Sequence, residues 1–213
     1  FWTLLSAHGY LLGAPRKLRI LLPQDEQVEY GSIKPRERNV QNADWRAWLA
    51  RREEMFRQDG RIAFDLFARN AEALLIRSQH IRRLITQRHP LIIVDEAQDT
   101  DAHAWRCIEL LSATAQIVCL ADLDQQIFDY LPGIGPERVD AIRQTLTPLE
   151  IDLGGQNHRS GGTEIAVFGQ DILVGRARGA PYAGVSSVAY NPKLRPQKTA
   201  LRMALGILQR AIR

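Results

Sequence analysis

Near the middle of the chain lies the stretch Leu91-Ile92-Ile93-Val94-Asp95-Glu96-Ala97-Gln98-Asp99-Thr100. Its four consecutive aliphatic residues follow Pro90 and predict a short strand that is buried on both faces, as in a parallel sheet. Two adjacent carboxylates, Asp95 and Glu96, come directly after this strand. Open α/β sheets place ligands and catalytic groups at the carboxyl ends of their strands. The stretch therefore predicts an α/β fold with an acidic site at one edge of its sheet.

An aliphatic strand that ends in Asp-Glu is the Walker B pattern of nucleotide hydrolases. In that pattern the aspartate holds Mg²⁺, and the glutamate orients or deprotonates the attacking water. We therefore predict that Asp95 is a metal ligand and that Glu96 is the catalytic base. The alternative interpretation is a buried strand followed by a solvated acidic turn.

The residues after the acidic pair narrow this choice. The pattern Asp-Glu-x-Gln-Asp-Thr, from Asp95 to Thr100, closely resembles motif II of the UvrD/Rep-type superfamily 1 DNA helicases. The resemblance implies RecA-like parallel sheets that bind ATP with Mg²⁺ and use its hydrolysis to move along single-stranded DNA and unwind duplexes. It also implies that Gln98 helps to bind the nucleotide.

A second buried strand is predicted over residues 117–121, and it again ends in a carboxylate, Asp122. The sequence from Asp122 to Phe128 resembles motif III of the family, usually Gly-Asp-x-x-Gln-x-Ile-Tyr, with Ala121 in place of the glycine and Phe128 in place of the tyrosine. Gln125 fits the glutamine that senses the γ-phosphate. A neutral amide suits this role because it can bond a phosphate oxygen or the attacking water without titrating.

Two aromatic residues, Phe128 and Tyr130, belong to the same region. In the family, aromatic residues here stack on the bases of single-stranded DNA, which is a contact that tolerates any base sequence. Tyr130 is the stronger candidate because it stands where the family usually has tryptophan. The alternative for these side chains is core packing.

A third strand is predicted over residues 149–153, and the sequence Gln156-Asn157-His158-Arg159-Ser160 follows it. This sequence resembles motif IV, Asn-Tyr-Arg-Ser. The resemblance implies that Arg159 reaches the γ-phosphate from a second RecA-like domain, where a guanidinium stabilises transferred charge. His158 replaces the tyrosine that stacks on adenine. The alternative for Arg159 is a solvated side chain in a polar loop.

A rival interpretation comes from Pro132-Gly133-Ile134-Gly135-Pro136, which an amphipathic helix is predicted to follow. This pattern is similar to a helix-hairpin-helix module, whose glycine-rich turn offers backbone N–H groups to a DNA phosphate. It would make the chain a non-catalytic DNA-binding or scaffold protein derived from a helicase. The simpler alternative is a glycine loop with Pro136 in the first turn of an ordinary helix.

Hydrophobic spacing and Gly/Pro breakers outline the remaining elements. Helices are predicted over residues 1–12, from Asp44 to about residue 57, over 62–85 as one or two helices, and over 105–111, 164–173 and 198–212. Strands are predicted over 16–22 and 185–190, and residues 23–43 are predicted to form a loop. The core candidates in the helical region before the acidic strand are Phe64, Leu66, Phe67, Leu74, Leu75, Ile76, Ile81 and Leu84.

The composition is that of an ordinary globular protein. The 213 residues are 45% hydrophobic and 24% charged, with a net charge of +4 that permits contact with DNA without demonstrating it. Cys107 and Cys119 have no metal-ligand spacing and are predicted to be reduced core residues of a cytoplasmic protein. No apolar run reaches the roughly 18 residues needed to cross a bilayer, so no membrane partner is expected.

Together these patterns predict two domains. Residues 1–147 would form a partial first RecA-like domain with a helical insertion, and residues 148–213 the start of a second. The phosphate-binding pattern Gly-x-x-x-x-Gly-Lys-Ser/Thr does not occur in the sequence. We therefore expect the chain to supply half of an ATP site, which a further protein segment or subunit completes, and to act on single- or double-stranded DNA.

Overall fold

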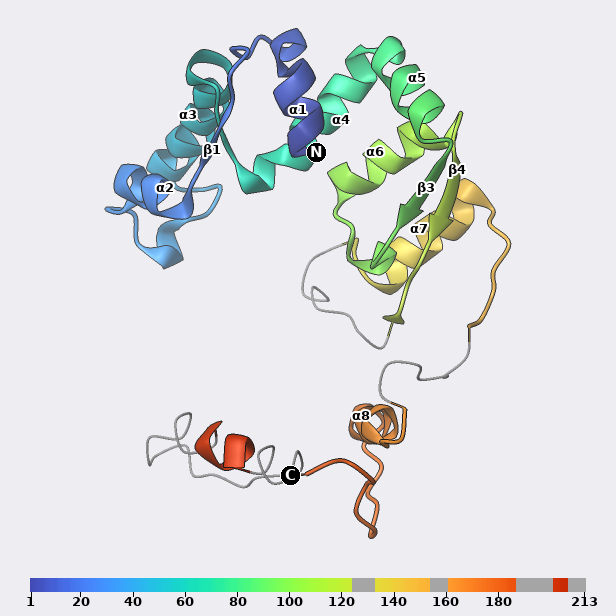
Figure 1. The fold of residues 1–213 in the computed structure, drawn as a ribbon. Helices are drawn as coiled ribbons and strands as arrows, with labels where there is room; N and C mark the ends of the chain where they lie inside the picture. Colours follow the sequence, from blue (N-terminus) through green and yellow to red (C-terminus); the bar gives the residue numbers. More distant parts are fainter. Residues whose placement is uncertain (124–132, 154–160, 187–200, 207–213) are drawn as a thin grey trace. The chain divides into compact units, whose positions relative to one another are not determined.

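The computed structural model describes residues 1–123, 133–153, 161–186 and 201–206 (Figure 1). The chain divides into two compact units, Phe1–Leu149 and Glu150–Arg213. The two RecA-like domains expected from the sequence, 1–147 and 148–213, remain a prediction. Each unit is described by itself below.

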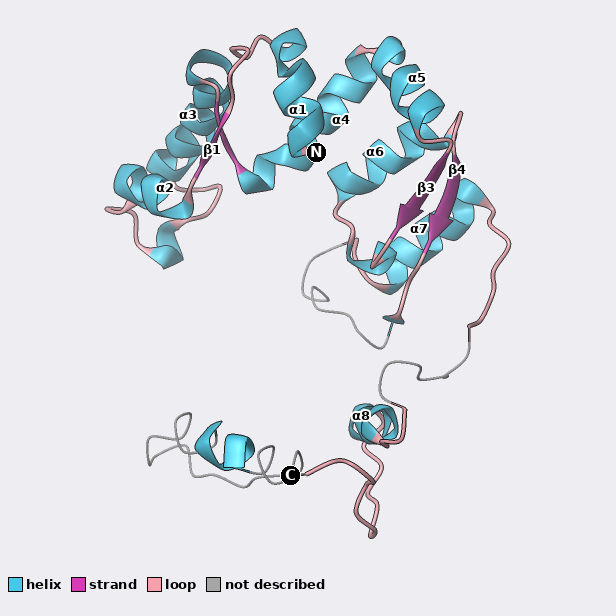
Figure 2. Cartoon of the chain, in the orientation of Figure 1, coloured by secondary structure: helices cyan, strands magenta, loops and turns pink. Residues whose placement is uncertain are grey.

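The first unit combines helices with two small parallel sheets (Figure 2). Its strands are β1 (Arg19–Leu21), β2 (Arg61–Ala63), β3 (Leu91–Val94) and β4 (Gln116–Cys119). Its α-helices are α1 (Trp2–His8), α2 (Pro23–Tyr30), α3 (Ala43–Asp59), α4 (Phe67–Arg77), α5 (Gln79–Arg88), α6 (Ala102–Ser112) and α7 (Pro136–Leu146). Short 3₁₀ turns cover Gly9–Leu12, Pro35–Glu37, Phe64–Leu66 and Ala97–Asp99. This mixture confirms the α/β class.

Both sheets have two strands among the described residues, and both are parallel. In the first, β1 pairs with β2 so that Ile20 lies opposite Ile62. In the second, β3 pairs with β4 so that Ile93 lies opposite Val118. Helix α6 makes the crossover between β3 and β4, as a parallel pair requires.

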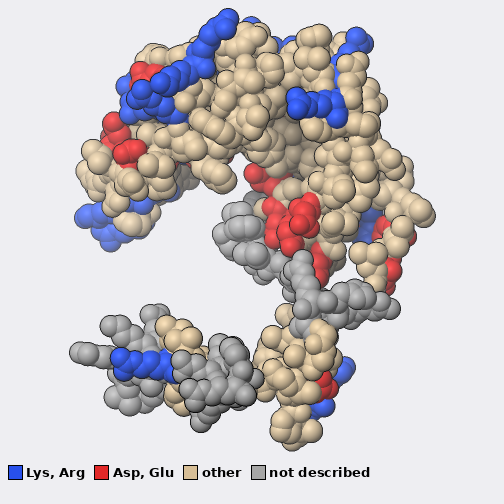
Figure 3. All heavy atoms as spheres, viewed as in Figure 1, with Lys and Arg blue, Asp and Glu red and all other residues tan. Residues whose placement is uncertain are grey.

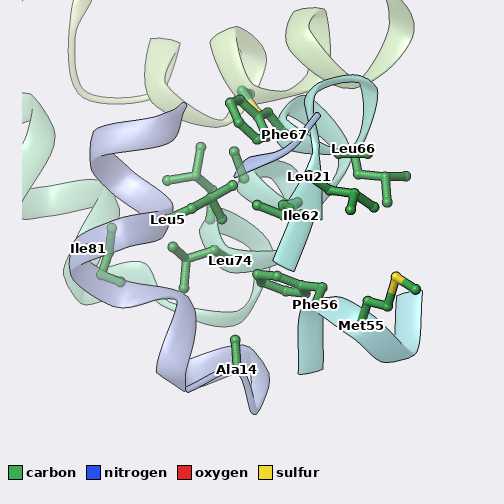
Figure 4. Close-up of a cluster of buried hydrophobic side chains, with 14 of the residues drawn as sticks. Leu5, Ala14, Leu21, Met55, Phe56, Ile62, Leu66, Phe67, Leu74 and Ile81 are labelled. Atoms are coloured by element: carbon green, nitrogen blue, oxygen red, sulfur yellow. The ribbon is translucent and has the colours of Figure 1, made fainter. Parts of the chain in front are cut away.

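The main core lies where α1, α3, α4 and β2 meet (Figure 4). Leu5, Ile62 and Leu74 are fully buried there. Leu66, Phe67, Leu75 and Ile81 are also buried, as predicted, but the prediction was wrong for Phe64, Ile76 and Leu84, which are exposed. Phe64 lies in a 3₁₀ turn, where the spacing of an α-helix does not apply, and the other two lie on outward faces of α4 and α5.

Helix α2 corrects the prediction of a loop over residues 23–43. Pro23 occupies its first turn, and Asp25 and Glu26 supply the negative charge that a helix N-terminus favours. The carboxylate of Glu26 lies 3.0 Å from Nε of the buried Arg52 on α3. Burial raises the pKa of Glu26, an effect that the attraction of Arg52 only partly offsets. Residues 23–30 have the polar composition of a linker, yet they form helix α2, which contacts α3.

Two further predictions of secondary structure need correction. Residues 61–63 form β2 rather than the start of a helix, because they pair with β1 across about 40 intervening residues. Residues 149–153 do not form a strand. Leu149, Ile151 and Leu153 are 88%, 71% and 79% exposed, so their alternation with acidic residues does not reflect a buried face.

The second unit contains α8 (Ile165–Leu173), which confirms the helix predicted there. Asp171 on this helix is 4% exposed, accepts a hydrogen bond from the Tyr182 hydroxyl at 2.9 Å, and pairs with Arg176. Residues 201–206 are helical, within the helix predicted over 198–212. Most of the strand predicted over 185–190 lies outside the described residues. No helix in the described part of the chain is long and apolar enough to cross a membrane.

Candidate functional site

Strand β3 carries the acidic pair and has two unlike faces. Val94 and Cys119 on β4 pack against a small core of Ala97, Trp105 and Ile142, to which α6 and α7 contribute. The opposite face is open: Leu91 and Ile93 are 49% and 60% exposed. The prediction of a strand buried on both faces was therefore wrong, because no described element covers the second face.

The acidic turn is fastened to the end of β4. Leu120 donates its backbone N–H to the Val94 carbonyl, and Ala97 donates its N–H to the Leu120 carbonyl, each at 2.8 Å. Between these bonds, Asp95 and Glu96 are both exposed. Figure 3 shows Asp and Glu atoms gathered at this end of the sheet. The carboxylates thus stand where parallel sheets place ligands.

Glu96 has an unusual backbone conformation. Its φ of 49° and ψ of 46° lie in the left-handed region, which few residues other than glycine adopt. The Asp95 carboxylate accepts a hydrogen bond from the Glu96 backbone N–H at 3.1 Å. This left-handed residue makes the sharp turn that directly follows the strand.

Gln98 lies under this turn and is fully buried. Its Nε2 donates to Oε2 of Glu96 at 2.6 Å, and its Oε1 accepts from the backbone N–H of Asp122 at 3.2 Å. Its backbone carbonyl accepts from the Gly135 N–H at 2.8 Å. The side chain predicted as a nucleotide contact therefore has both ends of its amide bonded within the protein.

Helix α7 contacts the residues that follow the acidic turn through Arg138. Arg138 is 6% exposed, its Nε donates to the Thr100 carbonyl at 3.0 Å, and its guanidinium lies 5.5 Å from the centre of the Trp105 ring. Burial lowers the pKa of Arg138. These contacts of Arg138 with Thr100 and Trp105 were not anticipated from the sequence, because residues more than 30 positions apart, 38 in the case of Thr100, carry no local signal of their pairing.

Comparison with known proteins places the sequence around this turn in a family. The model of the UvrD/REP helicase N-terminal domain matches residues 16–133, which include β3, the acidic turn and β4. The chain belongs to this family. The resemblance of residues 95–100 to motif II is thereby confirmed at the level of the family.

Two relatives carry related sequences. The RecB polypeptide of the RecBCD enzyme from Mycolicibacterium smegmatis is 30% identical over 151 residues, which are 70% of this chain and 13% of that protein. One component of an ATP-dependent helicase/nuclease from Lactococcus lactis is 29% identical over 103 residues, or 47% of this chain and 8% of that protein. The chain thus spans only a small part of the length of these relatives.

The acidic turn of this UvrD/REP-family chain offers carboxylate oxygens, the ligand type that magnesium prefers. Mg²⁺ in nucleotide enzymes is commonly held by one or two carboxylates together with substrate phosphates. The exposed Asp95 carboxylate offers an oxygen ligand of this kind. Within the described ranges, no cluster of three or more His, Cys, Asp or Glu side chains could hold a metal alone.

The structure brings together three of the predicted site residues, namely Asp95, Glu96 and Gln98. The other predicted residues lie outside the described residues: Gln125, Phe128, Tyr130, His158 and Arg159. Their roles remain predictions.

Proposed function

We propose that this chain is part of an ATP-dependent DNA helicase or translocase with a RecA-like core, which couples ATP hydrolysis to movement on single-stranded DNA and to duplex unwinding. One observation carries the proposal. In a chain of the UvrD/REP family, Asp95 and Glu96 stand exposed at the carboxyl end of a strand in a parallel pair.

The two carboxylates have different tasks in the proposed reaction. Asp95 would hold Mg²⁺, which when bound neutralises charge on the phosphates. Glu96 accepts a proton from a water molecule as the water oxygen attacks the γ-phosphorus. The bond between this phosphorus and the bridging oxygen breaks, the electron pair leaves with ADP, and inorganic phosphate is the second product. Gln125 would orient the water, and Arg159 would stabilise the transferred charge.

The nucleotide and the DNA would meet further residues of the chain. His158 would stack on adenine, while Phe128 and above all Tyr130 would stack on bases of single-stranded DNA. Both relatives are named as subunits of larger enzymes. We accordingly propose that another protein segment or subunit completes the ATP site.

The rival helix-hairpin-helix function finds less support in the contacts of its glycine turn. The Gly135 N–H donates to the Gln98 carbonyl, and the Gly133 N–H donates to the Glu137 carboxylate, each at 2.8 Å. Two N–H groups that a DNA phosphate would need are therefore bonded within the protein. Pro136 stands in the first turn of α7, in keeping with an ordinary helix start.

The test is Glu96→Gln in the complete gene product. The amide keeps the shape of the side chain but cannot take the proton, so DNA-stimulated ATP hydrolysis should fall by roughly 10²- to 10⁴-fold while Mg²⁺–ATP still binds. Asp101→Asn is the matched control, because it makes the same acid-to-amide change at an exposed helix cap that asparagine also satisfies. Equal turnover in wild type and Glu96→Gln would falsify the proposal.

A further inference from the structure

The buried amide of Gln98 connects the acidic turn to two other parts of the first unit. We propose that Gln98 is a positioning residue, which aims the Glu96 carboxylate and ties its orientation to both ends of the connection between β4 and α7. The inference rests on the proposed function, because it gives Glu96 the role of base. It replaces the expectation that Gln98 binds the nucleotide directly.

The first support is the burial of Gln98. Among the described side chains it is one of the few large ones that are fully buried, and the only polar one in that group. A buried amide destabilises the fold unless its polar atoms are hydrogen-bonded. Both ends of the Gln98 amide are bonded, and both bonds lead toward the acidic turn or the strand beside it.

The second support is the polarity of these two bonds. The carboxylate of Glu96 can only accept, and the Asp122 N–H can only donate. The amide therefore has one satisfied orientation, with its nitrogen toward Glu96 and its oxygen toward Asp122. A half-turn of the amide would set oxygen against oxygen and nitrogen against N–H. This orientation fixes Oε2 of Glu96 and leaves Oε1 as the oxygen that can take a proton.

The third support is the range of segments that Gln98 joins. Its side chain bonds Asp122, which follows β4, and its backbone carbonyl bonds Gly135, which precedes α7. One buried residue thus holds both ends of the connection over residues 122–135 and also holds Glu96. A displacement of Asp122 by about 1 Å would break its 3.2 Å bond and free the amide that aims the base.

The experiment compares Gln98→Met with Asn70→Leu in the complete gene product. Both changes replace a buried amide with an apolar side chain of similar length. The Asn70 side chain, however, donates to the Leu66 carbonyl on its own helix, and among the described contacts it has none with the acidic turn. Steady-state ATP hydrolysis is measured with saturating oligo-dT, and the binding of Mg²⁺–ATP is measured separately. Circular dichroism reports the folded fraction.

We expect Gln98→Met to lower kcat by roughly 10- to 100-fold, the loss that follows a misplacement of about 1 Å, with KM for ATP within about twofold of wild type. Asn70→Leu should lower thermal stability but leave kcat unchanged. Gln98→Glu is a second variant, which keeps the shape of the side chain and, when ionised, the acceptor for Asp122 but has no donor for Glu96. It should lose kcat in the same way.

Three results would overturn the inference. An unchanged kcat in folded Gln98→Met and Gln98→Glu would show that Glu96 needs no bridge. A raised KM with unchanged kcat would return Gln98 to the role of a nucleotide contact. Losses that match the unfolded fraction, with Asn70→Leu equally affected, would make the residue merely structural. A wild-type protein without ATP hydrolysis would instead refute the proposed function, and the inference with it.

Discussion

The exposed face of β3 predicts that a substitution there affects the stability of the isolated chain less than that of the complete protein. Ile93 is 60% exposed in this chain, and full burial of an isoleucine contributes about 1.5–3 kcal/mol. If the segment or subunit that we propose to complete the ATP site also covers this face, it adds the missing part of that burial. Six-tenths of the full contribution is about 1–2 kcal/mol. Ile93→Thr, which keeps the β-branched shape, should therefore cost about 1–2 kcal/mol more in the complete protein than in residues 1–213 alone.

Urea unfolding followed by tryptophan fluorescence measures both costs, each relative to its own wild type. Val28→Thr on α2 is the control. Val28 is 85% exposed, and valine and threonine have similar helix propensities, so its cost should be small and equal in both contexts. An Ile93→Thr cost that is the same in the isolated chain and in the complete protein would refute the idea that another segment covers β3.

Three further predictions follow from the site and the core. Tyr130→Ala should weaken binding to oligo-dT by roughly 1–3 kcal/mol and leave nucleotide affinity nearly unchanged; unaltered DNA binding would mean that the residue only packs. Asp95→Ala should weaken Mg²⁺–ATP binding in the complete protein, and calorimetry that finds normal affinity would contradict its role as a ligand. Burial raises the pKa of the Cys107 thiol from its ordinary 9.0 to about 12, so a disulfide reagent at a pH of about 8 should modify Cys107 only after unfolding. A native protein whose Cys107 reacts as fast as a free thiol would refute this protection. Because the folded state also holds the thiol proton more tightly than the unfolded state does, the free energy of unfolding should fall as the pH rises from 9.0 toward about 12.

The isolated chain should also lack activity. Residues 1–213 contain the acidic pair but no Gly-x-x-x-x-Gly-Lys-Ser/Thr loop to hold the β- and γ-phosphates. We therefore predict neither tight ATP binding nor hydrolysis from this piece alone. DNA-stimulated hydrolysis by the purified chain, abolished by Glu96→Gln, would contradict this prediction.

Local patterns were enough to predict the strand over residues 91–94 and the acidic turn after it, because the aliphatic run, Pro90 and the carboxylates are adjacent. The same holds for the start of α7, where Pro136 favours the first turn. These elements owe their form to neighbours within a few residues. The Asp95–Glu96 part of the candidate site was accessible to sequence reasoning for that reason.

Distant partners account for most of what the sequence did not predict. Strand β2 is three residues long and forms against β1, and α2 packs its Tyr30 ring 5.5 Å from the rings of Trp45 and Trp48. The Gln98 bridge likewise depends on Asp122, 24 residues away. Conversely, residues 149–153 have the alternation of a strand, yet they remain exposed without strand pairing.

Because Glu96 has a left-handed backbone, the residue that is best for stability at this position differs from the residue that is best for the proposed catalysis. A residue with a side chain is disfavoured in this region by roughly 1–2 kcal/mol, whereas glycine adopts it freely. Selection for thermostability alone would therefore enrich glycine or asparagine at position 96, and such variants would lack the proposed base. Directed evolution of this protein for heat resistance should accordingly be run with an activity screen, because the acidic turn is where stabilising and functional substitutions conflict.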